Sequence, residues 1–177
     1  SKINNFGAEY CSGEYILFLN NDTELIAKDS ISVMLGICQR KEVGAVGAKL
    51  LYADNTVQHA GVVIGFSNYA GHVFNGIGAD DYGYRLFPVI CRDYSAVTAA
   101  CMMVSKENFI SVGGFDEQFT VACNDVDLCL KLRKENKLVV YTPFSLWYHY
   151  ESKSRGYDTT PEKRERFLSE VSKAILR

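Results

Sequence analysis

The feature that most constrains the fold is the stretch EYILFLNNDTEL, residues 14–25, in which an apolar run stops at two amides and an acid. Tyr15 to Leu19 has the continuous apolar character of a strand buried on both faces, as parallel strands are. Asn20, Asn21 and Asp22 follow directly, and such residues are ordinary turn formers. An acid flanked by amides beyond the carboxyl end of a strand can also bind a hard divalent cation through oxygen. The stretch alone leaves both interpretations open.

The rest of the chain alternates helical and strand patterns. Helices are expected at 3–11, at 30–41, after Ser105, from Asn124 and from Pro161. Apolar strands are expected at 43–52, 56–65, 97–104 and 137–143, and Pro143 is expected to end the last of them. The turn-forming ADNT predicts a hairpin between the strands at 43–52 and 56–65, and Gly44 and Gly47 allow close backbone approach. Residues 67–93 show neither period and are expected to form a long loop. This order predicts an α/β sandwich with a mixed sheet, whose ligands bind beyond the carboxyl ends of the strands.

The composition narrows the function classes. The 177 residues suffice for one domain, and 47% hydrophobic with 23% charged residues is the balance of an ordinary globular protein. A net charge of -2 gives no general affinity for nucleic acid or anionic membrane, so no nucleic-acid partner is expected. The sequence shows no basic-then-apolar leader, and we expect a cytoplasmic protein. The six cysteines form no C-x-x-C pair, which favours buried free thiols over a zinc site.

A second candidate site lies in NDVDLCLKL, residues 124–132. In a helical register, Asp125 shares the inward stripe with Leu128 and Leu132, whereas Asp127 forms an ordinary solvated pair with Lys131. An acid on the inward stripe at a helix N-terminus either satisfies the first-turn amides or acts as a general base beside a cavity. Both interpretations remain open.

Histidines and basic residues give a weaker signal. His149 follows a strand among aromatic residues, where a half-buried structural histidine is the default interpretation. Lys153 and Arg155, just downstream, either bind phosphate or are solvated. His59 and His72 are interpreted as structural.

Together these segments resemble the family 2 glycosyltransferases, which have the GT-A fold. The resemblance covers nearly the whole chain through GEYILFLNNDTEL, VGAVGAKLLYADNTVQHAGVVIG, AVTAACMMVSKENFISVGGFDEQF, NDVDLCLKLR and VVYTPFSLWYHYESKSRG, in that order. Each motif is weak by itself, but five in one order are specific. The resemblance implies a transferase that uses a nucleotide-diphospho-sugar donor and a divalent metal.

The family's D-x-D motif, which binds Mg²⁺ or Mn²⁺ bridging the donor diphosphate, corresponds to Asn20-Asn21-Asp22 in this chain. The resemblance therefore implies that Asp22 is a metal ligand. Asn20, an amide in place of the first acid, would offer a neutral oxygen or contact the donor ribose. His149 matches the histidine that often completes the metal shell. The implied donor is a UDP- or dTDP-linked sugar.

The family's catalytic base is the Asp of an E-D pair after a G-G-F-D segment, and it corresponds to Asp125. The Glu of that pair is Asn124 here, a departure that bears on how the base is positioned. Gly113, Gly114 and Phe115 match the turn on the acceptor side. The resemblance thus implies that Asn124 and the Gly113–Phe115 turn contact the acceptor.

The start of the chain also departs from the family pattern. Family members open with strand-helix units that hold the nucleotide base, so we interpret residues 1–177 as the metal-binding and acceptor half of a GT-A domain. The implied reaction is inverting sugar transfer to a glycan or lipid-linked acceptor in polysaccharide biosynthesis. A homodimer and peripheral membrane association of the full enzyme are further expectations. The alternative is a non-catalytic remnant that binds a partner or glycan. A phosphate-metabolising hydrolase is disfavoured, because Asn20 stands where its nucleophilic acid would be.

Overall fold

The computed structural model describes residues 1–66, 69–119, 122–150 and 161–175. The elements, in chain order, are α1 (Lys2–Tyr10), β1 (Tyr15–Leu19), β2 (Thr23–Leu25), α2 (Ser30–Cys38), β3 (Val43–Leu51), β4 (Val57–His59), β5 (Val62–Ile64), β6 (Ala70–His72), the 3₁₀ segment η1 (Tyr84–Val89), β7 (Arg92–Asp93), β8 (Cys101–Ser105), α3 (Lys106–Ser111), α4 (Asn124–Lys134), β9 (Leu138–His149) and α5 (Pro161–Ile175).

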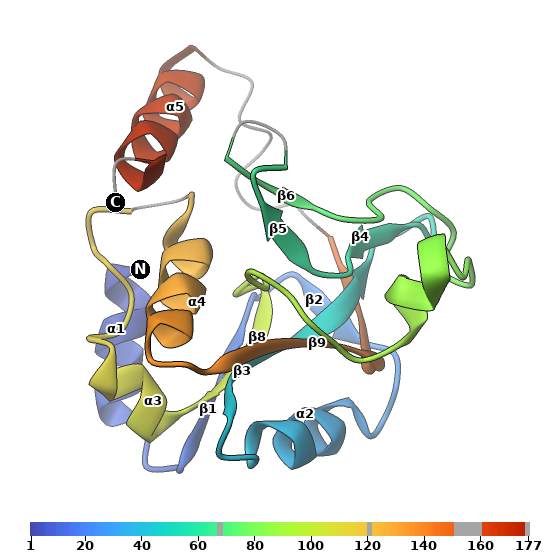
Figure 1. The fold of residues 1–177 in the computed structure, drawn as a ribbon, viewed down its shortest axis with the longest axis horizontal. Coiled ribbons are helices and arrows are strands. Elements are labelled where there is room, and N and C mark those ends of the chain that lie inside the picture. Colours follow the sequence, from blue (N-terminus) through green and yellow to red (C-terminus); the bar gives the residue numbers. More distant parts are fainter. Residues whose placement is uncertain (67–68, 120–121, 151–160, 176–177) are drawn as a thin grey trace.

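Within the described residues, seven strands form one mixed sheet whose central order is β1-β8-β3-β9-β2 (Figure 1). Strands β3 and β9 run parallel, whereas β1–β8, β3–β8 and β2–β9 are antiparallel. Strand β4 pairs with the end of β3, β7 pairs with β9, and β5 and β6 form a separate two-stranded ribbon. The predicted α/β class with a mixed sheet is confirmed.

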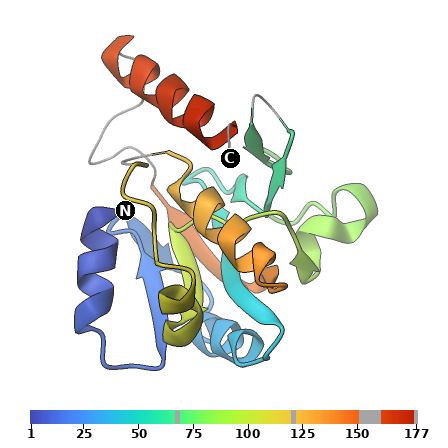
Figure 2. The ribbon, with the colours of Figure 1, turned by 60° about the vertical axis from the view of Figure 1, so that its left-hand side comes forward.

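Helices cover both faces of this sheet (Figures 1 and 2). On one face, Met34 and Cys38 of α2 belong to a buried cluster that includes Val46 and Met103 of the sheet. On the other face, Leu128 of α4 belongs to a second cluster that includes Ala45 and Val104. Helices α1 and α3 lie on the α4 side. Since successive residues of a strand point to opposite faces, β3 and β8 supply both clusters, which explains their unbroken apolar sequences.

Glycines in β3 let neighbouring segments approach closely, as predicted. All nine residues of β3 are buried. A Cβ added at Gly47 would lie 2.4 Å from the Cβ atom of Val97, and one added at Gly44 would lie 2.7 Å from the Cβ atom of Lys137. Real Cβ atoms do not come this close, so both positions require glycine unless the neighbour moves.

Several segments differ from the prediction. The strand expected at 56–65 is divided into β4 and β5, which belong to different sheets. Strand β9 does not end at Pro143 but continues to His149. Its register against β3 jumps from Thr142 to Leu146, so Pro143 lies in a bulge where its missing N–H costs no ladder bond. Strand β8 begins at Cys101, four residues later than expected. The 67–93 region contains β6, η1 and β7, whose strands have three and two residues, too few to show a period.

All six cysteines are free thiols, as predicted, but only three are buried. Burial raises the pKa of the Cys38 thiol to about 11 and those of Cys101 and Cys129 to about 12. Cys91 is exposed. None of the described helices is long and apolar enough to cross a membrane.

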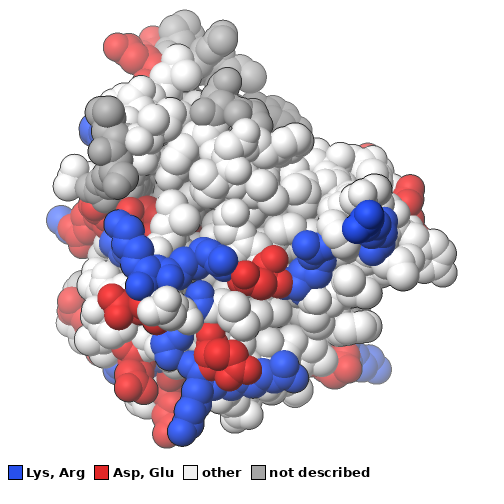
Figure 3. Space-filling model, viewed as in Figure 1, with Lys and Arg blue, Asp and Glu red and all other residues white. Residues whose placement is uncertain are grey.

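Basic and acidic side chains are interleaved on the face shown in Figure 3. Among the charged residues, Arg133 of α4 forms an ion pair with Asp93, with its Nη1 atom 2.6 Å from a carboxylate oxygen.

Candidate active site

Two strand ends meet where the sequence placed the candidate metal site. Leu19, the last residue of β1, pairs with Cys101, and the backbone N–H of Asn20 donates to the carbonyl of Ala100 (2.9 Å). Strand β2 then pairs with the end of β9, which sets Thr23 opposite His149. The Thr23 hydroxyl donates to the carbonyl of Asn20 (2.7 Å) and holds the intervening turn. The sheet therefore brings the Asn20–Asp22 turn against His149.

The side chains at this junction are within hydrogen-bonding distance. The Nε2 atom of His149 lies 3.2 Å from Oδ1 of Asp22, with only 10% and 16% of the two side chains exposed. The Nδ2 atom of Asn20 lies 3.1 Å from the same Nε2 atom. Asn21 is exposed in the turn. The structure thus brings together three of the four residues predicted for the metal and donor site.

Sequence reasoning missed a fourth partner, Gln58. Its Oε1 atom lies 2.6 Å from Nδ1 of His149, and its Nε2 atom donates to the backbone carbonyl of His149 (3.2 Å). The only signal in the sequence is one amide inside the apolar run TVQHAGVV.

Asp125 lies in the first turn of α4 and is half-buried. Its Oδ2 atom accepts from the backbone N–H of Ala99 (3.2 Å), and its Oδ1 atom accepts from that of Val126 (2.9 Å). The side-chain oxygen of Asn124 accepts from the N–H of Asp125 (2.7 Å). The carboxylate therefore binds a first-turn amide, as the capping interpretation requires, and backbone amides also fix its orientation, as a general base requires.

The segment that leads into β8 contacts both the Asn20–Asp22 turn and Asp125. Ala99 donates to Asp125, and the next residue, Ala100, accepts from Asn20. One short stretch of backbone thus holds both the Asn20–Asp22 turn and the N-terminus of α4.

Two neighbouring cavities open beside these residues. One, of about 390 Å³, is lined by His149, Gln58, Thr98 and others, and the second, of about 310 Å³, by Asp125, Cys123 and, from α5, Phe167 and Val171. His72 and Ala70 of β6 line both cavities. The β6 strand therefore lies between the histidine of the predicted metal site and the predicted base.

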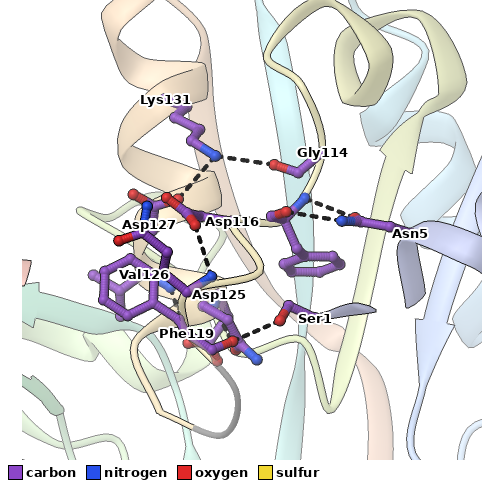
Figure 4. Close-up of polar contacts among 12 residues, drawn as sticks. Ser1, Asn5, Gly114, Asp116, Phe119, Asp125, Val126, Asp127 and Lys131 are labelled. Atoms are coloured by element: carbon purple, nitrogen blue, oxygen red, sulfur yellow. Dashed lines mark hydrogen bonds and ion pairs between the residues drawn. The ribbon is translucent and has the colours of Figure 1, made fainter. Parts of the chain in front are cut away.

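Asp127 and Lys131 form the predicted pair, but the prediction that this pair is solvated is wrong. Lys131 Nζ lies 2.9 Å from Asp127 Oδ2, but only 12% of the aspartate and 27% of the lysine side chain are exposed. Lys131 also donates to the carbonyl of Gly114 (3.1 Å), which ties α4 to the turn after α3 (Figure 4). The pair therefore lies next to a tertiary contact rather than on an open helix face.

The Gly113–Phe115 turn does not line the Asp125 cavity. Gly113 and Gly114, both with positive φ, end α3 and line a different cavity of about 550 Å³ with residues of α1. Asn5 of α1 exchanges two hydrogen bonds of 2.9 Å with the backbone of Phe115 (Figure 4). The Phe115 ring packs against Phe18 in the core. The acceptor role of this turn stays a prediction.

Of the remaining histidines, His59 is fully buried, with its Nδ1 atom 3.1 Å from Nδ1 of His72. Burial, followed by the neighbouring His72 and His149, holds the pKa of His59 well below its usual value. Lys153 and Arg155 lie outside the described residues.

Comparison with known sequences gives matches along nearly the whole chain. The profile of Glycosyltransferase like family 2 matches residues 1–175. The uncharacterized protein y4gI of Sinorhizobium fredii is 46% identical over 97% of this chain, and the O-antigen biosynthesis protein RfbC of Myxococcus xanthus is 43% identical over 90% of it. This chain spans only 19% and 13% of the lengths of those two proteins.

Solved structures share the fold. The mannosyltransferase PcManGT of Pyrobaculum calidifontis, in complex with GDP-Man and Mn²⁺, matches with a TM-score of 0.61 at 16% identity, over 98% of this chain and 42% of that one. GalNAc-T7 with UDP, GalNAc and Mn²⁺ matches with a TM-score of 0.69 at 10% identity, over 97% of this chain and 34% of that one. These similarities confirm the predicted GT-A fold. By its sequence, this chain belongs to Glycosyltransferase like family 2.

Proposed function

We propose that this chain carries the metal-binding and acceptor part of an inverting glycosyltransferase. The enzyme would transfer a sugar from a nucleotide-diphospho-sugar to a hydroxyl of a glycan or lipid-linked acceptor. The observation that carries the proposal is the meeting of Asn20, Asp22 and His149 at the ends of β1 and β9, with Asp125 in an adjoining cavity.

The donor atoms at this junction fit a hard divalent cation. Asp22 supplies a carboxylate and His149 an imidazole nitrogen only 3.2 Å away, and Asn20 supplies an amide that can turn its oxygen inward. The described residues contain no cluster of three or more His, Cys, Asp and Glu side chains suited to a metal. Two or three protein ligands suit Mg²⁺ or Mn²⁺, which usually keep waters and bind substrate phosphates. A bound cation would neutralise charge that develops on the leaving diphosphate.

Asp125 is proposed as the general base. Its carboxylate accepts the proton of the acceptor hydroxyl while that oxygen attacks the anomeric carbon of the donor sugar. The bond from that carbon to the diphosphate oxygen breaks on the opposite face, so the configuration inverts. The amides of Ala99 and Val126 orient the carboxylate for this step. Placing both reactants in adjoining cavities would contribute through proximity.

Relatives support the substrate class. The Myxococcus relative is named for O-antigen biosynthesis, and a 67-residue stretch is 37% identical to an N-acetylglucosaminyl-diphospho-decaprenol L-rhamnosyltransferase of Mycobacterium tuberculosis. The two solved structures carry Mn²⁺ with a GDP or UDP nucleotide. We therefore propose polysaccharide biosynthesis as the setting. A UDP- or dTDP-linked donor is proposed from the family resemblance of the sequence.

A thermal unfolding series tests this proposal. The chain is unfolded with Mn²⁺ alone and with Mn²⁺ plus UDP, dTDP or GDP. A ligand at 100 times its dissociation constant adds about 2.7 kcal/mol of stability, or roughly 5–10 °C for a chain of this size. Asp22→Ala is expected to abolish the shift. Asp29→Ala makes the same substitution at an exposed aspartate with no side-chain capping bond, and should retain the shift.

The outcomes separate two functions. A metal-dependent shift with one nucleotide, lost in Asp22→Ala, supports the transferase and identifies its donor class. The absence of any shift favours a non-catalytic domain that binds a partner or glycan. The amide at Asn20, where the family has its first acid, is the observation that favours this second function.

A further inference from the structure

Gln58 occupies a β-bulge next to the proposed metal site. Strand β3 pairs Leu50 with His59 but Leu51 with Val57, so the ladder skips Gln58. Bulges of this kind bend the strand and redirect a side chain, and they are common beside active sites. Gln58 is only 4% exposed, and its side chain reaches the end of β9.

The chemistry of the partner atoms fixes which one donates in each of the two hydrogen bonds between Gln58 and His149. The backbone carbonyl of His149 can only accept, so the Gln58 nitrogen that lies 3.2 Å from it must be the NH₂ group. The amide oxygen of Gln58 must then face Nδ1 of His149, at 2.6 Å. That oxygen can only accept as well, so Nδ1 must carry a hydrogen.

The opposite nitrogen of the His149 ring faces the proposed metal site. With the hydrogen on Nδ1, the neutral ring has a lone pair on Nε2. In this tautomer Nε2 accepts from the Nδ2 group of Asn20 (3.1 Å) and lies 3.2 Å from the Asp22 oxygen, a second acceptor. A bound metal ion would supply positive charge next to these two acceptors. In metal sites, a histidine whose second nitrogen donates to a fixed acceptor has its tautomer and ring orientation set in this way.

The bulge itself is held by a side chain from the loop after β6. The Nδ2 atom of Asn75 donates to the backbone carbonyl of Gln58 (3.0 Å), at the point where the β3–β4 ladder is interrupted. The orientation of Gln58 is therefore supported from its backbone as well as from His149.

From this geometry we infer that Gln58 is a positioning residue for the metal site. Its amide holds the hydrogen of His149 on Nδ1 and directs the Nε2 lone pair toward Asp22 and Asn20. The part of the inference that concerns metal rests on the proposed function, but the part that concerns the tautomer does not.

The tautomer can be measured on the metal-free chain by long-range ¹H–¹⁵N NMR correlations of the imidazole rings. The chain has three histidines, and a His149→Gln variant assigns the signal. Wild type and Gln58→Glu, whose carboxylate still accepts from Nδ1, should both show hydrogen on Nδ1. Gln58→Met, which removes both bonds, should lose this preference. Hydrogen on Nε2 in the wild type would overturn the inference.

Binding of Mn²⁺ alone, followed by electron paramagnetic resonance, gives the second readout. Gln58→Met should weaken binding about 10- to 100-fold, the usual effect of losing such a partner of a metal-bound histidine. Gln58→Glu should keep most of the affinity. Gln39→Met is the matched control, since Gln39 is exposed at the end of α2.

If a folded Gln58→Met variant binds Mn²⁺ with wild-type affinity, the inference is overturned. Equal losses of Mn²⁺ affinity in the Met and Glu variants would also overturn it, because they would indicate a role of Gln58 in packing alone. If Gln58→Met does not fold, the NMR comparison of wild type with Gln58→Glu still decides. If the wild type binds no Mn²⁺, the proposed metal site fails, whereas the tautomer measurement still tests Gln58.

Discussion

Replacing Gly47 by alanine should destabilise the fold and disturb the candidate site together. An added Cβ would lie 2.4 Å from the Cβ atom of Val97 and 2.7 and 2.9 Å from its two methyl carbons. Carbon atoms pack at about 3.5–4.0 Å, so Val97 or β3 must move by roughly 1 Å. Gly47 is buried between β8 and β9, and Val97 is fully buried in the segment before β8, which leaves little room for this shift.

Overpacking of a buried site costs about 1–3 kcal/mol of unfolding free energy, which corresponds to a fall of roughly 2–12 °C in Tm for a chain of this size. A displaced Val97 would also carry with it Ala99 and Ala100, which bond Asp125 and Asn20. The variant should therefore shift the amide resonances of these two alanines.

Urea denaturation of wild type and variant measures the cost. Gly36→Ala in α2 is the control, because an added Cβ there meets nothing within 4 Å. That substitution should stabilise the chain by about 0.5–1 kcal/mol, since glycine is a poor helix former. If Gly47→Ala proved as stable as wild type, the close approach of Val97 would not explain the glycine.

The other predictions concern catalysis, pH and thiol reactivity. Asp125→Asn should lower sugar transfer by about 10²- to 10⁴-fold, while the thermal shift with Mn²⁺ and nucleotide is retained; full activity would refute the base assignment. Because the pKa of His59 is depressed in the folded state, the unfolded state binds the extra proton below its own pKa. Stability should therefore fall as pH drops below about 6.5, by up to about 1.4 kcal/mol per pH unit, and His59→Gln should flatten this slope in urea titrations. An unchanged slope would show that other groups cause it. An aromatic disulfide reagent should label exposed Cys91 in the folded chain, whereas Cys101 and Cys129, with a pKa of about 12, should react only on unfolding; equal labelling rates would contradict their burial.

Local signals in the sequence were enough for several elements. The apolar run Tyr15–Leu19 forms β1 with the predicted bounds. Ser105 caps α3 through a bond from the N–H of Asn108 to its hydroxyl (3.1 Å), as a serine before a helix predicts. The convergence of Asp22 and His149 followed from the motif resemblance, because both residues lie at strand ends.

Features that depend on partners distant in the sequence were not predictable. The continuation of β9 past Pro143 depends on a register shift against β3, which a local proline signal cannot reveal. Likewise, the bulge at Gln58 depends on how β4 meets the end of β3, so the sequence showed only an isolated amide. The low exposure of Asp127 and the bond of its partner Lys131 to Gly114 also involve tertiary structure outside the helix.

The position of β1 has a consequence for assembly. Among the described strands, β1 pairs only with β8, so it is an outer strand of the sheet, and its last residue, Leu19, is 44% exposed. An outer strand offers unpaired backbone groups to any strand that adds to it. Because Asn20 follows directly, a strand added there would have one end beside the proposed metal site. Any strand that extends the sheet at β1 would therefore place new backbone groups next to Asn20, whatever the source of that strand.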